Sequence, residues 1–332
     1  MSNAYGLYGH IRANRTRSTI LIVGLFVLIY LLVFAFTLAF NGVVMGGEDL
    51  ETIIAETVWQ FGYLLPWATL GGALWVFLGY RFHQRMIDMS TGAKDVTREE
   101  EPDLYNLLEN LCISRGIPMP KLQVIESDVL NAYASGMNEK QYRIAVTRGL
   151  MNTLDREEME AVLGHELTHI RNGDVRLMVV AVVIAGIITL AGEMVFRSLR
   201  HMRMGSSSSS GGGKKGGGAI AILIAVVIIA IAWFLSLVIR FALSRSREYL
   251  ADAGSVELTK NPDAMIRALR KIEGKSEMPA VPSGIMEMCI DNQKNSVADL
   301  FSTHPSIERR IGKLVAVAGG QEGNAAVNSP ST

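Results

Sequence analysis

The stretch "VLGHELTHIRNGD", residues 162–174, contains two histidines, a glutamate and an aspartate within one apolar helical pattern. His165 and His169 are four residues apart, so an α-helix places both imidazoles on one face about one turn apart. Two imidazoles in that arrangement can hold one metal ion. Glu166 lies beside the first of them, where its carboxylate can act as general base on a water that the metal activates. HExxH on a helix is a metalloprotease signature with this chemistry.

The alternative is a helix in which the two histidines are incidental. Histidine is scarce, with six in the whole chain and two of them in this spacing. The helix would be buried by its apolar neighbours, and unpaired imidazoles would be costly there. These neighbours are Val162, Leu163, Leu167 and Ile170. The sequence therefore favours a metal site.

A catalytic zinc takes three protein ligands and keeps one position open, so two histidines are not enough. No third histidine follows His169 closely, and a glutamate on a second helix is the better candidate. In "SRSREYLAD", Glu248 is followed four residues later by Asp252, which can fix a ligand histidine by a hydrogen bond. The alternative is a solvated acidic face balanced by Arg245 and Arg247.

Composition indicates a membrane protein with a soluble part. Only 19% of the 332 residues are charged, 49% are hydrophobic, and the mean hydropathy is +0.25. Basic and acidic residues balance at 32 each, so no nucleic-acid partner is expected. Cys112 and Cys289 fit no metal-ligand pattern and are expected to be reduced core thiols.

Four apolar segments divide the chain, at about 18–40, 58–80, 176–196 and 219–243. The first is too long for a signal peptide and reads as a membrane span. The predicted organisation is an N-terminal membrane hairpin, a first catalytic part, a second apolar hairpin, a second catalytic part and a disordered tail. Their residues are 1–80, 81–175, 176–243 (with the Gly/Ser/Lys linker 197–218 as a flexible tether), 244–317 and 318–332.

Charges at the ends of the apolar segments predict the topology. Three arginines precede the first span, whereas residues 41–57 contain no Lys or Arg, which puts the N-terminus in the cytoplasm. Arg81 and Arg85 then return the chain inside, so residues 81–175 are expected to be cytoplasmic. The linker 197–218 carries five basic residues, although one full span after residue 175 would put it outside. Whether the third and fourth segments cross fully stays open.

The soluble parts are expected to be mainly helical with a small β-sheet. Strands are predicted at "KLQVIE" and "YRIAVT", separated by the turn-rich residues 127–141. Helices are predicted at 97–117 with a Thr97/Glu100 capping box, at 155–174 with Asp155 and Glu158, at 244–258, and at 261–273 with Asn261 as cap.

Five segments together resemble one known family. They are "LYGHIRANR", "NAYASG" (131–136), "GHELTHIRNGD" (164–174), "SRSREYLADAGSVEL" (244–258) and "STHPSIERRI" (302–311). The chain resembles the HtpX-type membrane zinc metalloproteases, relatives of the CAAX prenyl proteases. The resemblance covers nearly the whole chain and implies an integral membrane protein, mainly α, whose zincin-like HExxH domain carries a small sheet and up to four membrane-associated helices.

The resemblance also implies a function. It points to a cytoplasm-facing endopeptidase of the plasma membrane that cleaves misfolded or damaged membrane proteins in quality control and the stress response. One zinc ion per subunit would be held by His165, His169 and Glu248, with Glu166 as general base. The resemblance also implies that Asp174 positions the site.

Two further stretches have a functional and a structural interpretation. Asn131, Ala132, Tyr133 and Ala134 either form an active-site edge that pairs with an extended substrate, or a turn of small residues. His304 and Arg309 either stabilise the oxyanion of the reaction, or belong to a helix-capping surface segment.

Two other functions stay open at this point. One is a site-specific processing peptidase of the prenyl-protease type, although four apolar segments are few for the chamber of such enzymes. The other is a non-catalytic membrane protein with a structural metal site, against which the presence of Glu166 argues. The expected partners are polypeptides and the lipid bilayer.

Overall fold

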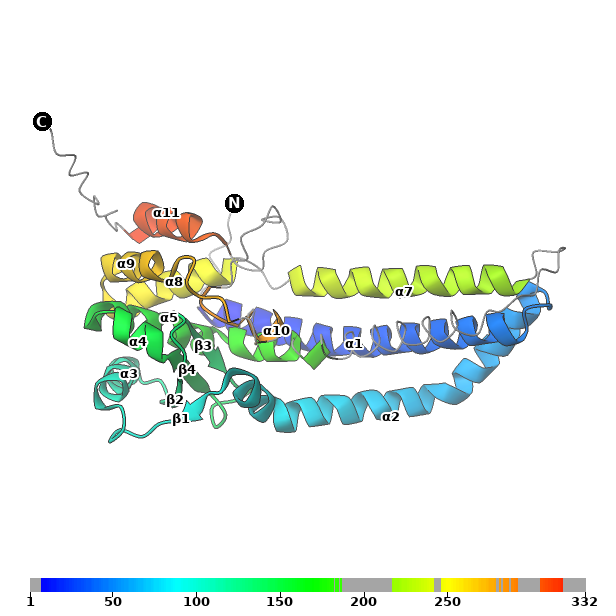
Figure 1. Cartoon of the computed structure of the whole chain (residues 1–332), viewed down its shortest axis with the longest axis horizontal. Helices are drawn as coiled ribbons and strands as arrows, with labels where there is room; N and C mark the ends of the chain where they lie inside the picture. Colours follow the sequence, from blue (N-terminus) through cyan, green and yellow to red (C-terminus); the bar gives the residue numbers. More distant parts are fainter. Residues whose placement is uncertain are drawn as a thin grey trace, which may run out of the picture. The chain divides into compact units, whose positions relative to one another are not determined.

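The protein is described by a computed structural model that is mostly helical and contains one four-stranded sheet (Figure 1). It describes residues 7–181, 183–184, 186, 217–241, 246–278, 281, 283–286, 288–291 and 305–318. The chain forms two compact units. The head unit comprises residues 1–15, 83–179 and 243–332, and the helical unit comprises residues 16–82 and 180–242.

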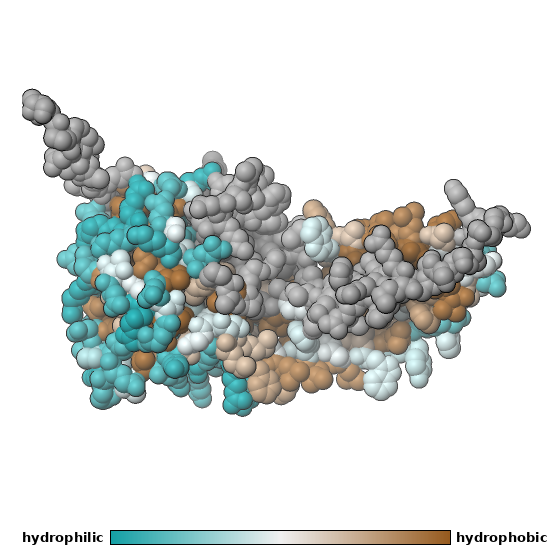
Figure 2. All heavy atoms as spheres, in the orientation of Figure 1, coloured by the Kyte–Doolittle hydropathy of each residue, from teal (hydrophilic) through white to brown (hydrophobic). Residues whose placement is uncertain are grey.

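Among the described residues, three helices are long and apolar enough to cross a membrane. They are α1 (Leu7–Val44), α2 (Leu50–Thr91) and α7 (Gly217–Phe241), with candidate spans Ser18–Val44, Leu50–Thr91 and Gly217–Leu235. Hydrophobic side chains gather on the surface of the helical unit, as a lipid-facing bundle requires (Figure 2). The prediction of an integral membrane protein that is mainly α is confirmed.

Small residues bring α1 and α7 together. Their shared core consists of Ala35 and Leu38 of α1 and Ala221 and Ala225 of α7, together with Ile53 of α2. A Cβ atom on Gly218 would lie 2.6 Å from the Gly46 Cα atom, so only glycine permits this backbone approach. The Gly217 N–H donates to the Glu48 carbonyl at 3.1 Å, which places the start of α7 beside the loop that joins α1 and α2.

The end of the predicted flexible tether is part of a helix. Gly217 and Gly218, the last two residues of the predicted linker, form the first turn of α7, where Gly218 packs against Gly42 of α1 and Gly217 packs against Glu48 to Leu50. Residues 197–216 of the linker lie outside the described part of the chain. The third apolar segment is helical at residues 176–181, 183–184 and 186, and its remainder is likewise outside the described residues.

The sheet of the head unit has the strand order β1-β2-β4-β3. The strands are β1 (Lys94–Asp95), β2 (Lys121–Ile125), β3 (Ala132–Ser135) and β4 (Arg143–Thr147). The two predicted strands are the central, parallel pair β2 and β4, whereas β1 and β3 run antiparallel at the edges. β3 lies within residues 127–141, which the sequence analysis treated as turn-rich. Turn residues outnumber its short apolar run there, so this strand was not predicted.

Seven helices of the head unit surround this sheet among the described residues. They are α3 (Pro102–Arg115), α4 (Arg148–Thr153), α5 (Arg156–Asn172), α8 (Ser246–Thr259), α9 (Pro262–Ile272), α10 (Ser283–Met286) and α11 (Ile307–Ala318). α5 packs against β3 and β4 as well as against α8 and α9 (Figure 1). It is therefore buried on most of its circumference.

Two of the predicted caps are present. The Asp155 carboxylate accepts the Glu158 N–H at 2.9 Å, and the Glu158 carboxylate accepts the Asp155 N–H at 2.9 Å, which completes a capping box at the start of α5. At α9 the Asn261 side chain accepts the Ala264 N–H at 3.0 Å. The bonds between Asp155 and Glu158 determine where α5 begins, and the bond from Asn261 determines where α9 begins.

The predicted start of α3 is wrong. The Glu100 carboxylate accepts the Thr97 N–H at 2.7 Å, but these residues form a turn and the helix begins only at Pro102. A proline disfavours the helical conformation of the residue before it, so Glu101 cannot extend the helix backward.

Candidate metal centre

The two histidines of the HExxH motif lie on the buried side of α5. His165 is 0% exposed and His169 is 4% exposed. Their Nε2 atoms are 3.2 Å apart, and the two rings are nearly perpendicular at 87°. The four-residue spacing thus converges both imidazoles on one point.

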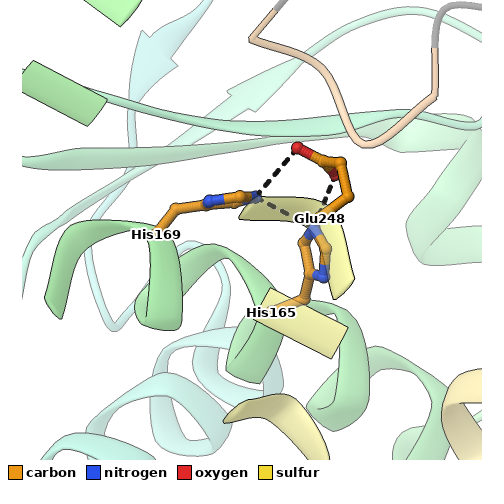
Figure 3. A group of neighbouring side chains, drawn as sticks. All are labelled: His165, His169 and Glu248. Carbon is orange, nitrogen blue, oxygen red and sulfur yellow. Dashed lines mark hydrogen bonds and ion pairs between the residues drawn. The ribbon is translucent and has the colours of Figure 1, made fainter. Parts of the chain in front are cut away.

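Glu248 reaches this point from α8. Its Oε2 atom is 3.6 Å from His165 Nε2, and its Oε1 atom is 3.6 Å from His169 Nε2 (Figure 3). Ligands at about 2.0–2.1 Å from a tetrahedral metal are separated by about 3.3 Å. The Nε2–Nε2 separation of 3.2 Å is close to this value, and each Nε2 atom lies 3.6 Å from a different oxygen of the Glu248 carboxylate. One ligand atom from each of the three residues lies within 4.8 Å of the others, which is compact enough for one metal ion. The structure therefore brings together the three ligands that the sequence suggested.

Carboxylates hold the far sides of both rings. His165 Nδ1 lies 2.9 Å from Asp252 Oδ1, and His169 Nδ1 lies 3.0 Å from Asp174 Oδ2. Each Nδ1–H can donate to its carboxylate, which leaves Nε2 as the ligand atom. Gly173 ends α5 with φ +72°, a left-handed conformation that turns the chain so that Asp174 returns to His169.

Glu248 can reach the histidines because α8 approaches α5 very closely. The Ser255 hydroxyl donates to the Ala161 carbonyl at 2.5 Å across the two helices. A Cβ atom on Gly254 would lie 2.6 Å from Thr168 Oγ1 and would overlap Thr168 Cγ2. The Thr168 side chain is stiff and its hydroxyl bonds the Gly164 carbonyl at 2.7 Å, so it cannot yield easily.

Glu166 lies next to His165 on α5 and is buried. It is 1% exposed, and neither carboxylate oxygen has a hydrogen-bond partner among the described residues. Burial raises the pKa of Glu166 above its usual value. A buried carboxylate without a partner is costly in a purely structural setting, so this arrangement points to chemistry.

The electrostatics of the site favour positive charge between the ligands. Burial opposes a charged imidazole, yet the carboxylates of Glu248 and Asp174 raise the pKa of His169 to about 10. For His165, burial is likewise outweighed by the hydrogen bonds of Asp252 and Glu248, and its pKa is raised. Negative carboxylates surround the point where two imidazoles and one glutamate converge, and a cation there would balance their charge. This set of ligand atoms fits a divalent metal ion such as zinc.

Arg310 is a residue of the site that the sequence analysis missed. It is 1% exposed and forms a bidentate pair with Asp252, at 2.9 Å from Nε and 2.6 Å from Nη2. Burial alone would raise the pKa of Asp252, but the Arg310 charge keeps it lowered. Arg310 therefore holds Asp252 ionised in its place behind His165.

A signal for Arg310 is present in the sequence. Ile307, Ile311 and Leu314 form the buried stripe of α11, and Arg310 falls on that stripe. Arg309, the residue that the sequence analysis named, is exposed on the other face of α11. His304 lies outside the described residues.

The stretch Asn131 to Ala134 is buried beside α5. Asn131 is 0% exposed and its amide donates to the carbonyls of Ser276 and Asp291. Ala132, Tyr133 and Ala134 belong to the edge strand β3, which contacts α5. The turn interpretation is therefore wrong for residues 132–134.

Comparisons with known proteins agree with this architecture. Residues 98–318 match the model of peptidase family M48, and the chain belongs to this family. It is 39% identical over 269 residues to a "Protease HtpX homolog" of Bacteroides fragilis strain YCH46, covering 79% of this chain and 83% of that protein. It is 37% identical over 318 residues to a "Protease HtpX homolog" of Listeria innocua, covering 93% and 99%.

Among solved structures, the chain is similar to Ste24p of S. mikatae, with a TM-score of 0.43 and 19% identity. That alignment covers 74% of this chain and 57% of the other. Family membership and the similarity to HtpX proteases confirm the resemblance inferred from the motifs, and the protein is a metalloprotease.

Replacing Gly254 by alanine should push α8 away from α5 and weaken metal binding, because the new Cβ overlaps Thr168. Thr168→Ala alone should keep the metal, and the double variant should regain part of what Gly254→Ala loses. The measurement is the metal content of purified protein for all four members of this cycle. Equal metal content in Gly254→Ala and the parent would show that the close approach is not required.

Arg310→Lys should lower metal affinity by roughly 10–100-fold, because lysine cannot form the bidentate pair that fixes Asp252. Arg309→Lys is the matched control one residue away, on the exposed face of α11, and should bind metal as the parent does. Competition with a chromogenic chelator measures both affinities. If the two variants lose affinity equally, the role assigned to Arg310 is wrong.

Proposed function

We propose that this metalloprotease binds one zinc ion through His165, His169 and Glu248 and cleaves misfolded or damaged polypeptides, membrane proteins included, as an endopeptidase. The observation that carries the proposal is the convergence of His165, His169 and Glu248, whose ligand atoms lie within 4.8 Å of one another, beside a buried Glu166 whose carboxylate has no hydrogen-bond partner among the described residues.

The reaction can be described by the roles of the protein's own groups. A zinc ion held here would supply a Lewis acid and would lower the pKa of water toward about 7. Glu166 accepts the proton of the attacking water, and burial raises the pKa of its carboxyl, which favours proton uptake. It then returns the proton to the amine that leaves. Asp252 and Asp174 keep the imidazoles oriented during these steps.

The other two functions are less well supported. Membership of a peptidase family argues against a non-catalytic protein with a structural metal site. A site-specific peptidase of the prenyl-protease type would use the same chemistry on a narrower substrate. The metal centre alone does not separate the two, so the substrate has to be tested directly.

We also propose that the protein is a multi-pass protein of the plasma membrane with its head unit in the cytoplasm. The loop that follows α1 lacks basic residues, and Arg81 and Arg85 follow the apolar part of α2. The start of α7 lies beside that same loop, at Glu48. On this proposal α7 leads the chain back inward to α8, and the basic linker before it lies outside despite its charge.

Glu166→Gln should retain stoichiometric zinc and lose casein cleavage by about 10²–10⁴-fold, because the amide cannot accept a proton. Glu248→Ala should lose both zinc and cleavage, because one of three ligands is gone. Zinc content and proteolysis are measured on the same full-length preparations in detergent.

A farnesylated peptide with a C-terminal processing site, assayed beside casein, tests the competing function. Cleavage of casein at many sites supports the proposed endopeptidase. Cleavage of the farnesylated peptide alone would replace it with a site-specific processing peptidase, and a Glu166→Gln variant that still cleaves would overturn the general-base role.

The topology predicts which positions a membrane-impermeant maleimide reaches on intact cells. Gly47→Cys in the α1–α2 loop and Ser208→Cys in the linker should react, whereas Lys140→Cys in the head unit should react only after permeabilisation. Cys112 and Cys289 are buried, so the unmodified chain provides the background. Labelling of Lys140→Cys on intact cells would reverse the proposed orientation.

A further inference from the structure

The edge strand β3 already has a partner from its own chain. Tyr133 and Cys289 form an antiparallel β-bridge, and the Ile290 N–H donates to the Ala132 carbonyl at 2.9 Å. β3 is the outer strand next to β4, so this bridge lies on its otherwise open side. The backbone of residues 289–290 therefore occupies positions that an added extended peptide would use.

The same segment is bound to the metal centre from its other side. Arg310 Nη1 donates to the Ile290 carbonyl at 2.7 Å, while the same guanidinium holds Asp252. Arg310 Nη1 is also 3.9 Å from Glu248 Oε2, one of the converging ligand atoms. A backbone carbonyl is thus fixed next to the site, as the carbonyl of a bound peptide would be.

A small polar cluster anchors the end of this segment. The Ser276 hydroxyl donates to Asp291 Oδ2 at 2.6 Å, and the Asn131 amide donates to the Asp291 carbonyl at 3.2 Å. All three side chains are buried, at 0–2% exposure. The anchor consists of a few neutral or charge-assisted hydrogen bonds, and the hydrogen bonds of a binding peptide can replace them.

The reactive groups are closed off in this arrangement. His165, Glu166, Glu248 and His169 are exposed by no more than 4%. The segment lies beside these groups, because the Ile290 carbonyl accepts a hydrogen bond from Arg310, which also holds Asp252. A polypeptide cannot reach the ligands or Glu166 without displacing part of the chain.

We propose that residues 288–291 form an autoinhibitory strand that occupies the peptide-binding edge at β3, and that an extended substrate must displace it before cleavage. This inference rests on the proposed endopeptidase function. Until the strand is displaced, the active site of the resting enzyme is closed to neighbouring proteins and to folded proteins. It opens only for an extended polypeptide that can pair with β3.

A disulfide can test whether the strand must move. Since the Ile290–Ala132 hydrogen bond flanks the pair, Tyr133 and Cys289 are a non-hydrogen-bonded pair, whose Cα atoms are typically about 4.5 Å apart. That separation is within the range for a disulfide. Tyr133→Cys in a Cys112→Ala background can therefore lock the strand onto β3 by oxidation.

The oxidised variant should cleave casein at least tenfold more slowly than the same sample after reduction. Tyr133→Ser in the same background is the matched control, because it lacks the phenol but cannot cross-link, and its activity should not respond to oxidant. A cross-link verified by mass spectrometry that leaves cleavage unchanged overturns the proposal. A wild-type enzyme that never cleaves casein overturns the endopeptidase function instead, and the proposal with it.

A second measurement needs no new cysteine and decides the question if Tyr133→Cys does not fold. The two native cysteines are both buried, one in the strand and one, Cys112, in α3. In Glu166→Gln with saturating casein, alkylation of Cys289 should become several-fold faster while Cys112 keeps its rate. Equal protection of Cys289 with and without casein, in an enzyme whose wild type cleaves casein, overturns the autoinhibitory strand alone.

Discussion

The close approach of α5 and α8 is the constraint on which the rest of the site depends. Two imidazoles on one helix fix a point, but a third ligand must arrive within 3.6 Å of both Nε2 atoms. Gly254 permits this approach because it leaves no Cβ atom in the space of Thr168. Packing of α5 against the sheet, and of both helices against α9, then makes the geometry rigid, since a packed interior does not deform gradually.

Burying so many ionisable groups is unfavourable unless each has a counterpart, and the contacts around α5 show how this is solved. Asp252 is paired with Arg310, while Asp252 and Asp174 each face the Nδ1 atom of a ligand histidine. Both Glu166 carboxylate oxygens lack a hydrogen-bond partner among the described residues, and burial raises the pKa of this group. In the proposed mechanism Asp252 and Asp174 position the histidines, whereas Glu166 takes part in the reaction.

The order of the chain gives the membrane segments a second consequence. The HExxH helix and the Glu248 helix are separated in sequence by residues 180–242, which belong to the helical unit. Both histidines therefore come from chain that precedes the later apolar segments of the helical unit, whereas Glu248 comes from chain that follows them.

The sequence by itself determined the parts of this protein that depend on local spacing. His165 and His169 are neighbours because of the helical period, Asp155 and Asn261 start helices through bonds to residues three positions away, and the long apolar runs specify spans. Glu248 and Asp252 could be paired for the same reason, as residues four apart on one helix.

Only the tertiary structure decided what depends on contacts between distant segments. Arg310 rather than Arg309 lies at the site because α11 buries the face that carries Ile307, Arg310 and Ile311. Which of two adjacent arginines is buried depends on how α11 packs against its neighbours. β3 was hidden because a four-residue edge strand takes its stability from β4 and from residues 289–290, not from its own composition. The helical period relates residues that are four positions apart in the sequence. Ligand convergence, strand pairing and the burial of charge depend instead on contacts between residues that are far apart in the sequence.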